Sequence, residues 1–322
     1  MAQNEESRMN STPFISILIP CYNAAKFVHQ AINSCLSQDY TNFEIILVDD
    51  GSTDDTLHVI RDFEKEYANI SVFSQQNAGS SSARNLAIQH AKGDYFLYLD
   101  TDDVLVPNAL INYTKVLKNK KTVVIARWLT AFKTNPAENV ESQYIDYPYP
   151  DKISKVLEYR PVVSAFFVPK NTILWDEKLR IWEINTYLLE VVLENNFEIA
   201  FISDITSIIY QDVSQERVSI KYDHFNMLIT AQMAIRWKEY IAKHNKLNPI
   251  SEVLLDEIII SNAYGLSKIS KWKEAFNLLK KINKNNVKYG KLYKNSTLFK
   301  LVSIHPLIGL SFFSCATTLI GR

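Results

Sequence analysis

The stretch EIILVDDGSTD, residues 44–54, decides the fold of this chain. Its mostly apolar beginning, FEIILV at 43–48, predicts a buried strand that ends abruptly at two aspartates and a glycine. Similar short apolar runs alternate with segments of helical period through the first half of the chain, and they predict further strands at residues 14–19, 70–74, 95–99 and 122–126. Strands that alternate with helices predict an α/β fold, with a mostly parallel sheet and helices on both faces.

Acidic clusters follow two of these predicted strands, at residues 49–50 and 100–103. Because ligands of open α/β sheets bind outside the carboxyl ends of the strands, we expect both clusters at one edge of the sheet. Several carboxylates at one edge suit a cation with hard oxygen ligands, Mn²⁺ or Mg²⁺. Asp54 and Asp55 are interpreted instead as turn or cap residues of the helix that follows.

Composition excludes several classes of protein. The 322 residues are 47% apolar and 22% charged, which is typical of a globular protein. The first 110 residues carry 6 Lys/Arg and 15 Asp/Glu, which argues against a nucleic-acid partner there. The three cysteines lack the spacing of a zinc site or a disulfide framework. There is no GxGxxG and no P-loop, so a dinucleotide or P-loop enzyme is not expected.

Four motifs together resemble family 2 glycosyltransferases with the Rossmann-like GT-A fold. They are ILIPCYNA at 17–24, EIILVDDGSTD at 44–54, NAGSSSARN at 77–85 and GDYFLYLDTDD at 93–103. Their order and spacing match the family over roughly residues 14–110. The segment 100–104, DTDDV, also fits the nucleophile pattern of haloacid-dehalogenase-like phosphatases, but there the pattern follows the first strand, whereas here at least three predicted strands precede it.

The resemblance implies an inverting glycosyltransferase that uses a nucleotide-diphospho-sugar, a UDP-sugar, together with Mn²⁺ or Mg²⁺. The first motif would line the nucleoside pocket, the second would hold uracil and ribose, and the arginine of the third would lie near the base or the diphosphate. The residues so assigned to the donor are Pro20, Tyr22, Asn23, Asp49, Asp50, Arg84, Asp100 and Thr101. By the same resemblance, Asp102 would ligate the metal.

The base that deprotonates the acceptor hydroxyl is less clearly marked. In the family it is usually the aspartate of a Glu-Asp pair, but this sequence has Glu183-Ile184 at the corresponding place. Three interpretations stay open. Glu183 is the base in a shifted register, or Asp176 or Glu177 serves instead, or the protein is a catalytically impaired subunit that binds a nucleotide or a partner.

The last hundred residues change character. Two segments of helical period follow residue 221, with a break at 247–249. Residues 271–300 hold nine lysines and one acid, and 301–321 hold no charged residue at all. A basic stretch followed by an apolar one suits an anionic membrane surface. The expected division is therefore a flexible tail at 1–12, a GT-A domain at 13–220, a helical region at 221–297 and an apolar segment or membrane anchor at 298–322.

These features predict where the protein works and on what. The polar beginning of the chain lacks the apolar core of a signal peptide, so we expect a cytoplasmic enzyme at the inner face of the cell membrane. The expected partners are a UDP-sugar donor and a surface polysaccharide or lipid-linked glycan acceptor, with no nucleic acid. The helical region is compatible with a homo-oligomer.

Overall fold

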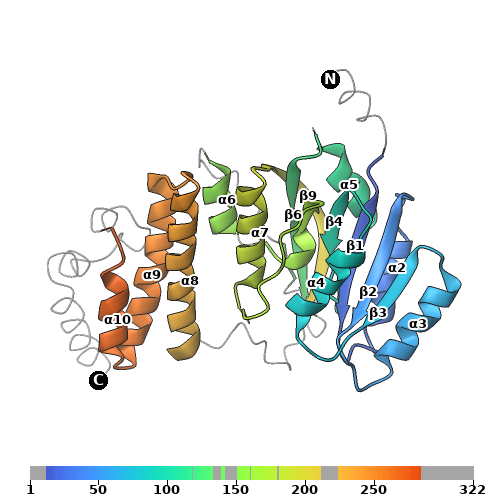
Figure 1. Ribbon diagram of the computed structural model, residues 1–322, viewed down its shortest axis with the longest axis horizontal. Coiled ribbons are helices and arrows are strands. Elements are labelled where there is room, and N and C mark those ends of the chain that lie inside the picture. The colour runs from blue at the N-terminus through green and yellow to red at the C-terminus, as the bar shows by residue number, and fades with distance from the viewer. Residues whose placement is uncertain are drawn as a thin grey trace. The chain divides into compact units, whose positions relative to one another are not determined.

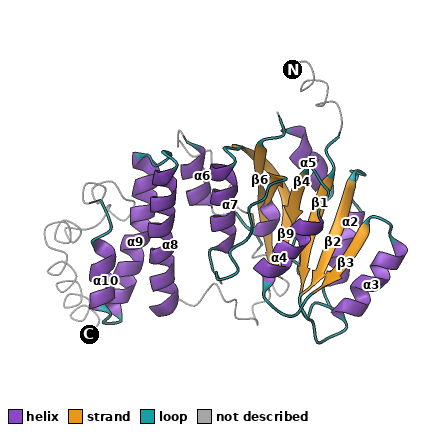
Figure 2. Cartoon of the chain, in the orientation of Figure 1, coloured by secondary structure: helices purple, strands orange, loops and turns teal. Residues whose placement is uncertain are grey.

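The structure is a computed structural model, and it describes residues 12–117, 119–132, 139–141, 151–159, 161–179, 181–211 and 224–283 (Figures 1 and 2). It divides into two compact units. One comprises Met1–Tyr147 and Arg160–Glu216, and the other Pro148–Tyr159 and Arg217–Arg322. Each unit is described separately below.

The first unit contains the sheet and the helices that cover it (Figure 2). Its elements in chain order are β1 (Ile15–Cys21), α2 (Val28–Leu36), β2 (Phe43–Asp49), α3 (Thr56–Glu66), β3 (Ile70–Ser74), α4 (Ser80–His90), β4 (Tyr95–Tyr98), β5 (Asp103–Leu105), α5 (Ala109–Lys115), β6 (Thr122–Phe132), β7 (Val140–Glu141), a 3₁₀ turn (Val163–Ala165), β8 (Phe166–Pro169), α7 (Glu183–Glu194) and β9 (Glu198–Gln211).

The sheet is mixed. Within the described residues its strand order is β3-β2-β1-β4-β8-β6-β9-β5, and β7 pairs with β6. The four strands β3, β2, β1 and β4 are parallel, as the sequence predicts. Strand β8 then runs antiparallel between β4 and β6, while β6 and β9 pair in parallel. The predicted α/β fold, with helices packed on the sheet, is therefore confirmed.

The two faces of the sheet are buried because its central strands are apolar on both sides. All seven residues of β2 are buried, which is the expected pattern for a parallel strand covered by helices on both faces. The core on one face gathers side chains from α2, α3 and α5 against β1 and β2. On the other face α4 lies against β1 and β2 and buries Ala83 and Ala87. The carboxyl ends of these strands are left for a site.

The second unit is a small helical bundle. Its elements are α6 (Lys152–Tyr159), α8 (His224–Lys243), α9 (Pro249–Lys268) and α10 (Trp272–Leu279). Helix α9 begins where the sequence predicts a break: the Asn248 side chain accepts the N–H groups of Ile250 and Ser251, and Pro249 occupies the first helical position. Helix α6 packs on α9, so residues 148–159 group with the bundle, although the predicted first domain runs from 13 to 220.

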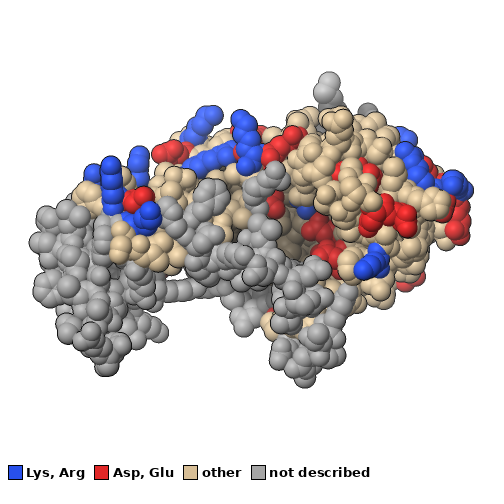
Figure 3. Space-filling view, turned by 90° about the horizontal axis from the view of Figure 1, so that it is seen from below, with Lys and Arg blue, Asp and Glu red and all other residues tan. Residues whose placement is uncertain are grey.

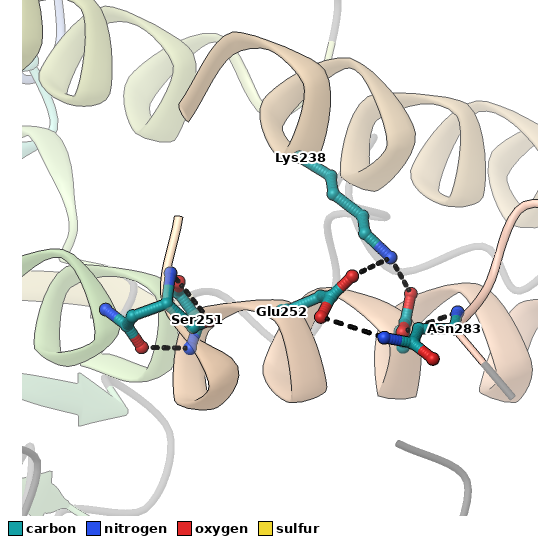
Figure 4. Close-up of polar contacts among 6 residues, drawn as sticks. Lys238, Ser251, Glu252 and Asn283 are labelled. Atoms are coloured by element: carbon teal, nitrogen blue, oxygen red, sulfur yellow. Dashed lines mark hydrogen bonds and ion pairs between the residues drawn. The ribbon is translucent and has the colours of Figure 1, made fainter. Parts of the chain in front are cut away.

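A polar cluster between helices holds the bundle together (Figure 4). Lys238 of α8 lies 3.0 Å from Glu252 and 2.9 Å from Asp256, both on α9. The Asn283 backbone N–H donates to Asp256 Oδ2 at 3.0 Å, and its side-chain amide donates to Glu252 Oε2 at 3.2 Å. Because each carboxylate has a cation and an amide as partners, the charges are compensated where water is largely excluded.

Within the described part of the chain, no helix combines the length and the apolar character needed to cross a bilayer. The apolar segment predicted at 298–322 lies outside the described residues. Its contact with a membrane therefore stays a prediction.

Candidate active site

The carboxyl ends of β1, β2 and β4 meet at one edge of the sheet. Cys21 pairs with Asp49, and the Asp50 N–H donates to the Cys21 carbonyl at 2.8 Å. On the other side of β1, the Leu99 N–H donates to the Leu18 carbonyl at 3.1 Å. The two acidic clusters at 49–50 and 100–103 therefore begin at the same edge, as predicted. In Figure 3, which shows the molecule from below, acidic side chains of this unit lie beside a hollow.

Asp50 braces this edge from inside. It is 3% exposed, and its Oδ1 accepts hydrogen bonds from the Gln75 side chain and the Ala78 N–H, both at 2.8 Å. Its Oδ2 accepts the N–H of Gly79, the residue that precedes α4, at 2.8 Å. Asp50 thus ties the end of β2 to the start of α4. A direct contact with the donor would use lone pairs that these three bonds leave over.

We expect Asp50→Asn to destabilise the fold by about 2 kcal/mol, because an amide group cannot accept all three bonds and leaves a buried N–H facing another donor. Urea unfolding would measure this loss. The matched control is Asp55→Asn, since Asp55 is exposed and its side chain makes no capping bond. Equal stability of the two variants would contradict the bracing role.

The loop after β1 interlocks with the loop after β2. Asn23 has a left-handed backbone, with φ of 47°, and its Oδ1 accepts the Thr53 N–H at 2.8 Å. Its own N–H donates to Ser52 Oγ at 3.0 Å. Between the loops, Asp49 is buried and accepts the Ser52 N–H at 3.3–3.4 Å. Tyr22 is 51% exposed, so its ring offers a flat surface on which a base can stack.

Asp54 acts as the sequence predicts, in the turn before α3. Its carboxylate accepts the Thr56 N–H at 3.0 Å, the Ala25 N–H at 3.2 Å and the Thr56 hydroxyl. These hydrogen bonds lower the pKa of Asp54, against the opposing effect of desolvation, which is the largest single contribution. The turn interpretation is confirmed for this residue.

Arg84 on α4 binds Asp100, the first residue of the second acidic cluster. Its Nη2 donates to Asp100 Oδ1 at 2.8 Å, and its guanidinium lies 4.6 Å from the centre of the Trp175 ring. Only 3% of Arg84 is exposed, whereas 38% of the Asp100 side chain is. A buried guanidinium thus holds a carboxylate that remains partly accessible, which fixes the orientation of Asp100 at the edge of the sheet. Among the described residues, the buried Nε of Arg84 has no hydrogen-bond partner.

An aromatic layer lies beside this pair. Trp175 stacks on Tyr187 of α7 with ring centres 4.3 Å apart, and the hydroxyls of Tyr98 and Tyr187 are 2.6 Å apart. Burial raises the pKa of Tyr187 to about 12 and raises the pKa of Tyr98 well above its ordinary value. Both phenols therefore stay neutral at physiological pH. This layer joins β4, which leads to Asp100, to helix α7.

Glu183 is the first residue of α7 and is partly buried. It follows Trp182, whose left-handed backbone (φ of 65°) starts the helix. Residues four apart share one side of a helix, so Glu183 lies one turn before Tyr187, on the same side of α7. The aromatic layer thus includes Tyr187, which lies one turn from Glu183 on α7, and Tyr98, which lies two residues before Asp100.

The remaining predicted residues lie around the same edge. Pro20 and Thr101 are half-buried, in β1 and after β4 respectively, and Asp102 is exposed. Within the described residues, no group of three or more His, Cys, Asp or Glu side chains could hold a metal ion. An exposed carboxylate such as Asp102 fits Mn²⁺ or Mg²⁺ that is bound through one or two carboxylates, water and substrate phosphates rather than in an all-protein cage.

The sequence did not single out Asn85, Tyr98, Trp175 or Tyr187 as site residues. Asn85 is buried, and its amide bonds the Trp175 backbone. Its place in the third motif, directly after Arg84, was a usable signal. The aromatic side chains gave a weaker signal: Trp175 and Tyr187 flank the acidic segment around Glu183 and would suit stacking on a sugar, but such residues more often belong to a core.

Comparison with known proteins gives a family and several relatives. A family model described as "Glycosyl transferase family 2" matches residues 16–180. The chain is 34% identical to a hyaluronan synthase of Pasteurella multocida over 144 residues, which are 45% of this chain and 15% of that protein. It is 38% identical to a chondroitin synthase of Escherichia coli over 106 residues, 33% of this chain and 16% of that protein. The matched part thus spans under a fifth of these two relatives.

Solved structures resemble the chain over nearly its whole length. S. aureus TarS 1–349 in complex with UDP-GlcNAc superposes with a TM-score of 0.68 and 17% identity, covering 95% of this chain and 92% of that one. The mannosyltransferase PcManGT from Pyrobaculum calidifontis, in complex with GDP-Man and Mn²⁺, gives a TM-score of 0.55 and 15% identity, covering 95% and 88%. At such identities the likeness shows a shared fold.

Proposed function

Because the chain belongs to glycosyl transferase family 2 and is a glycosyltransferase with the GT-A fold, we propose that it transfers a sugar, with inversion, from a UDP-sugar to a glycan hydroxyl. The observation that carries the proposal is the Arg84–Asp100 pair, in which a buried guanidinium holds an accessible carboxylate beside the ends of β1 and β2. Such a carboxylate can accept hydrogen bonds from sugar or ribose hydroxyls.

The donor is proposed to lie across the edge formed by β1, β2 and β4. The ring of Tyr22 would stack on the base, and Asp49 would accept hydrogen bonds from the base or the ribose. Asp100 would bind the sugar or ribose, and Asp102 would hold Mn²⁺ or Mg²⁺ against the diphosphate. When bound, the metal would neutralise charge on the departing diphosphate. Pro20, Asn23 and Thr101 would shape the walls around these groups.

Glu183 is proposed as the base that removes the proton of the acceptor hydroxyl. It lies at the start of α7 on the side of the aromatic layer, and a carboxylate there can accept that proton. Ile184, where the family usually has the aspartate, is only partly buried and cannot take this role. The acceptor is proposed to be a surface polysaccharide or lipid-linked glycan, which agrees with the names of the two synthase relatives.

The proposal is tested by measuring UDP or GDP release from a panel of UDP-sugars and GDP-sugars, with Mn²⁺, with Mg²⁺ and with chelator. We expect metal-dependent release of UDP from one UDP-sugar and none from the GDP-sugars. Release of GDP alone would overturn the donor assignment. Binding of UDP without turnover of any donor, repeated with oligosaccharide acceptors, would favour the impaired, partner-binding alternative.

A further inference from the structure

Asn85 holds the segment before α7 by its backbone. Its Oδ1 accepts the Trp175 N–H at 2.7 Å, and its Nδ2 donates to the Trp175 carbonyl at 3.0 Å. An amide side chain thereby satisfies both polar backbone groups of one buried residue, as a neighbouring strand would. Trp175 is 1% exposed, so water cannot bond its backbone groups and the Asn85 amide takes that role. The two hydrogen bonds fix the position and the orientation of the Trp175 backbone relative to α4.

Glu177 provides a third bond to the same amide. Its Oε1 accepts from Asn85 Nδ2 at 2.9 Å, although the Glu177 side chain itself lies at the surface. The buried Asn85 is thus anchored at Trp175 and at Glu177, on either side of one residue. We call the three residues Asn85, Trp175 and Glu177 the amide clamp.

The amide clamp connects the two sides of the proposed reaction. Asn85 follows Arg84 directly on α4, and Arg84 holds Asp100 on the donor side. Trp175 stacks on Tyr187, one turn into α7 from Glu183, on the acceptor side. Helix α4 therefore holds Asp100 through Arg84, and it holds Trp175, which packs on α7, through the next residue, Asn85.

We propose that Asn85 is a positioning residue, which through Trp175 fixes α7 and hence Glu183 relative to the donor, and that Glu177 anchors Asn85 instead of serving as the base. This inference rests on the proposed function. It also separates Asp176 from Glu177, which the sequence left as alternative bases, because Glu177 accepts from the clamp amide whereas Asp176 accepts the Lys178 N–H. Glu177 acts as a hydrogen-bond acceptor, a role that does not require it to take a proton.

The test compares Asn85→Ala and Glu177→Gln with wild type, using the UDP-sugar that supports UDP release. A misplacement near 1 Å can cost about 100-fold in rate, so we expect Asn85→Ala to lower the maximal release rate by about 10- to 100-fold. Its affinity for UDP with Mn²⁺ should fall much less than the rate, since the Arg84–Asp100 hydrogen bond does not depend on Asn85, although Arg84 packs on the Trp175 ring. Glu177→Gln keeps an acceptor oxygen and should keep the wild-type rate within about twofold.

The control variant is Gln89→Ala, which removes an exposed amide one turn further along α4. Hydrogen exchange provides a readout that does not depend on activity. In Asn85→Ala, peptides covering residues 171–179 should exchange faster, whereas peptides from β1 and β2 should not change.

Each other outcome overturns a defined part of the inference. A wild-type rate in Asn85→Ala rejects the positioning role, and a parallel loss of UDP affinity places Asn85 on the donor side instead. A loss of about 100-fold or more in Glu177→Gln makes Glu177 the base. If wild type releases no nucleotide from any donor, the proposed function fails, while unchanged exchange at 171–179 in Asn85→Ala would reject the clamp independently.

Discussion

Asp102→Asn should lower metal-dependent release of UDP by about 100-fold or more. Charge stabilisation by a bound divalent ion is worth several kcal/mol, and about 3 kcal/mol corresponds to roughly 100-fold in rate. An amide is a far weaker ligand than a carboxylate for a hard cation.

The measurement is a Mn²⁺ titration of UDP binding and of UDP release in both proteins. Wild type in chelator should fall to the level of the variant, because both then lack the ion. Asp39→Asn is the matched control, since Asp39 is exposed, precedes β2 and lies at the opposite end of that strand. A variant that keeps the wild-type dependence on Mn²⁺ would remove Asp102 from the metal site.

The parts of the fold that the sequence predicts are those with a local cause. Strands β1, β2, β3 and β4 are short apolar runs. The sequence Asp49-Asp50-Gly51 predicts the end of β2. The turn requires a glycine at position 51, because its backbone is left-handed (φ of 72°) and a Cβ there would lie 2.7 Å from the Asn77 backbone N. Because parallel strands end at one edge, locating the acidic clusters at strand ends was enough to bring them together.

The parts that escaped prediction depend on partners distant in sequence. Strand β8 pairs antiparallel with β4, matching Phe96 with Val168, and nothing in either strand indicates that partner. The same holds for Asp50, whose bonds go to the loop at 75–79, and for Asn85, whose partners follow β8. Helix α6 is amphipathic, so its sequence predicts that one side is buried. It does not indicate which of the two units covers that side.

Glu183→Gln should lower the maximal rate of UDP release by about 10²- to 10⁴-fold, the usual contribution of a general base. Glutamine has the same shape but cannot take the proton of an acceptor hydroxyl or of water. Affinity for UDP with Mn²⁺ should not change, since the proposed donor contacts lie on β1, β2 and β4. Asp176→Asn should keep the wild-type rate, because Asp176 uses its carboxylate to accept the Lys178 N–H at 3.0 Å.

A nucleophile that carries no proton distinguishes a variant that lacks the base from a variant that lacks the metal ion. Azide needs no deprotonation, so adding it should restore UDP release in Glu183→Gln. It should not restore release in Asp102→Asn, whose defect concerns the departing diphosphate. Rescue of both variants or of neither would show that the two carboxylates do not act on opposite sides of the bond. A wild-type rate in Glu183→Gln would remove Glu183 as base and turn the search to Asp176.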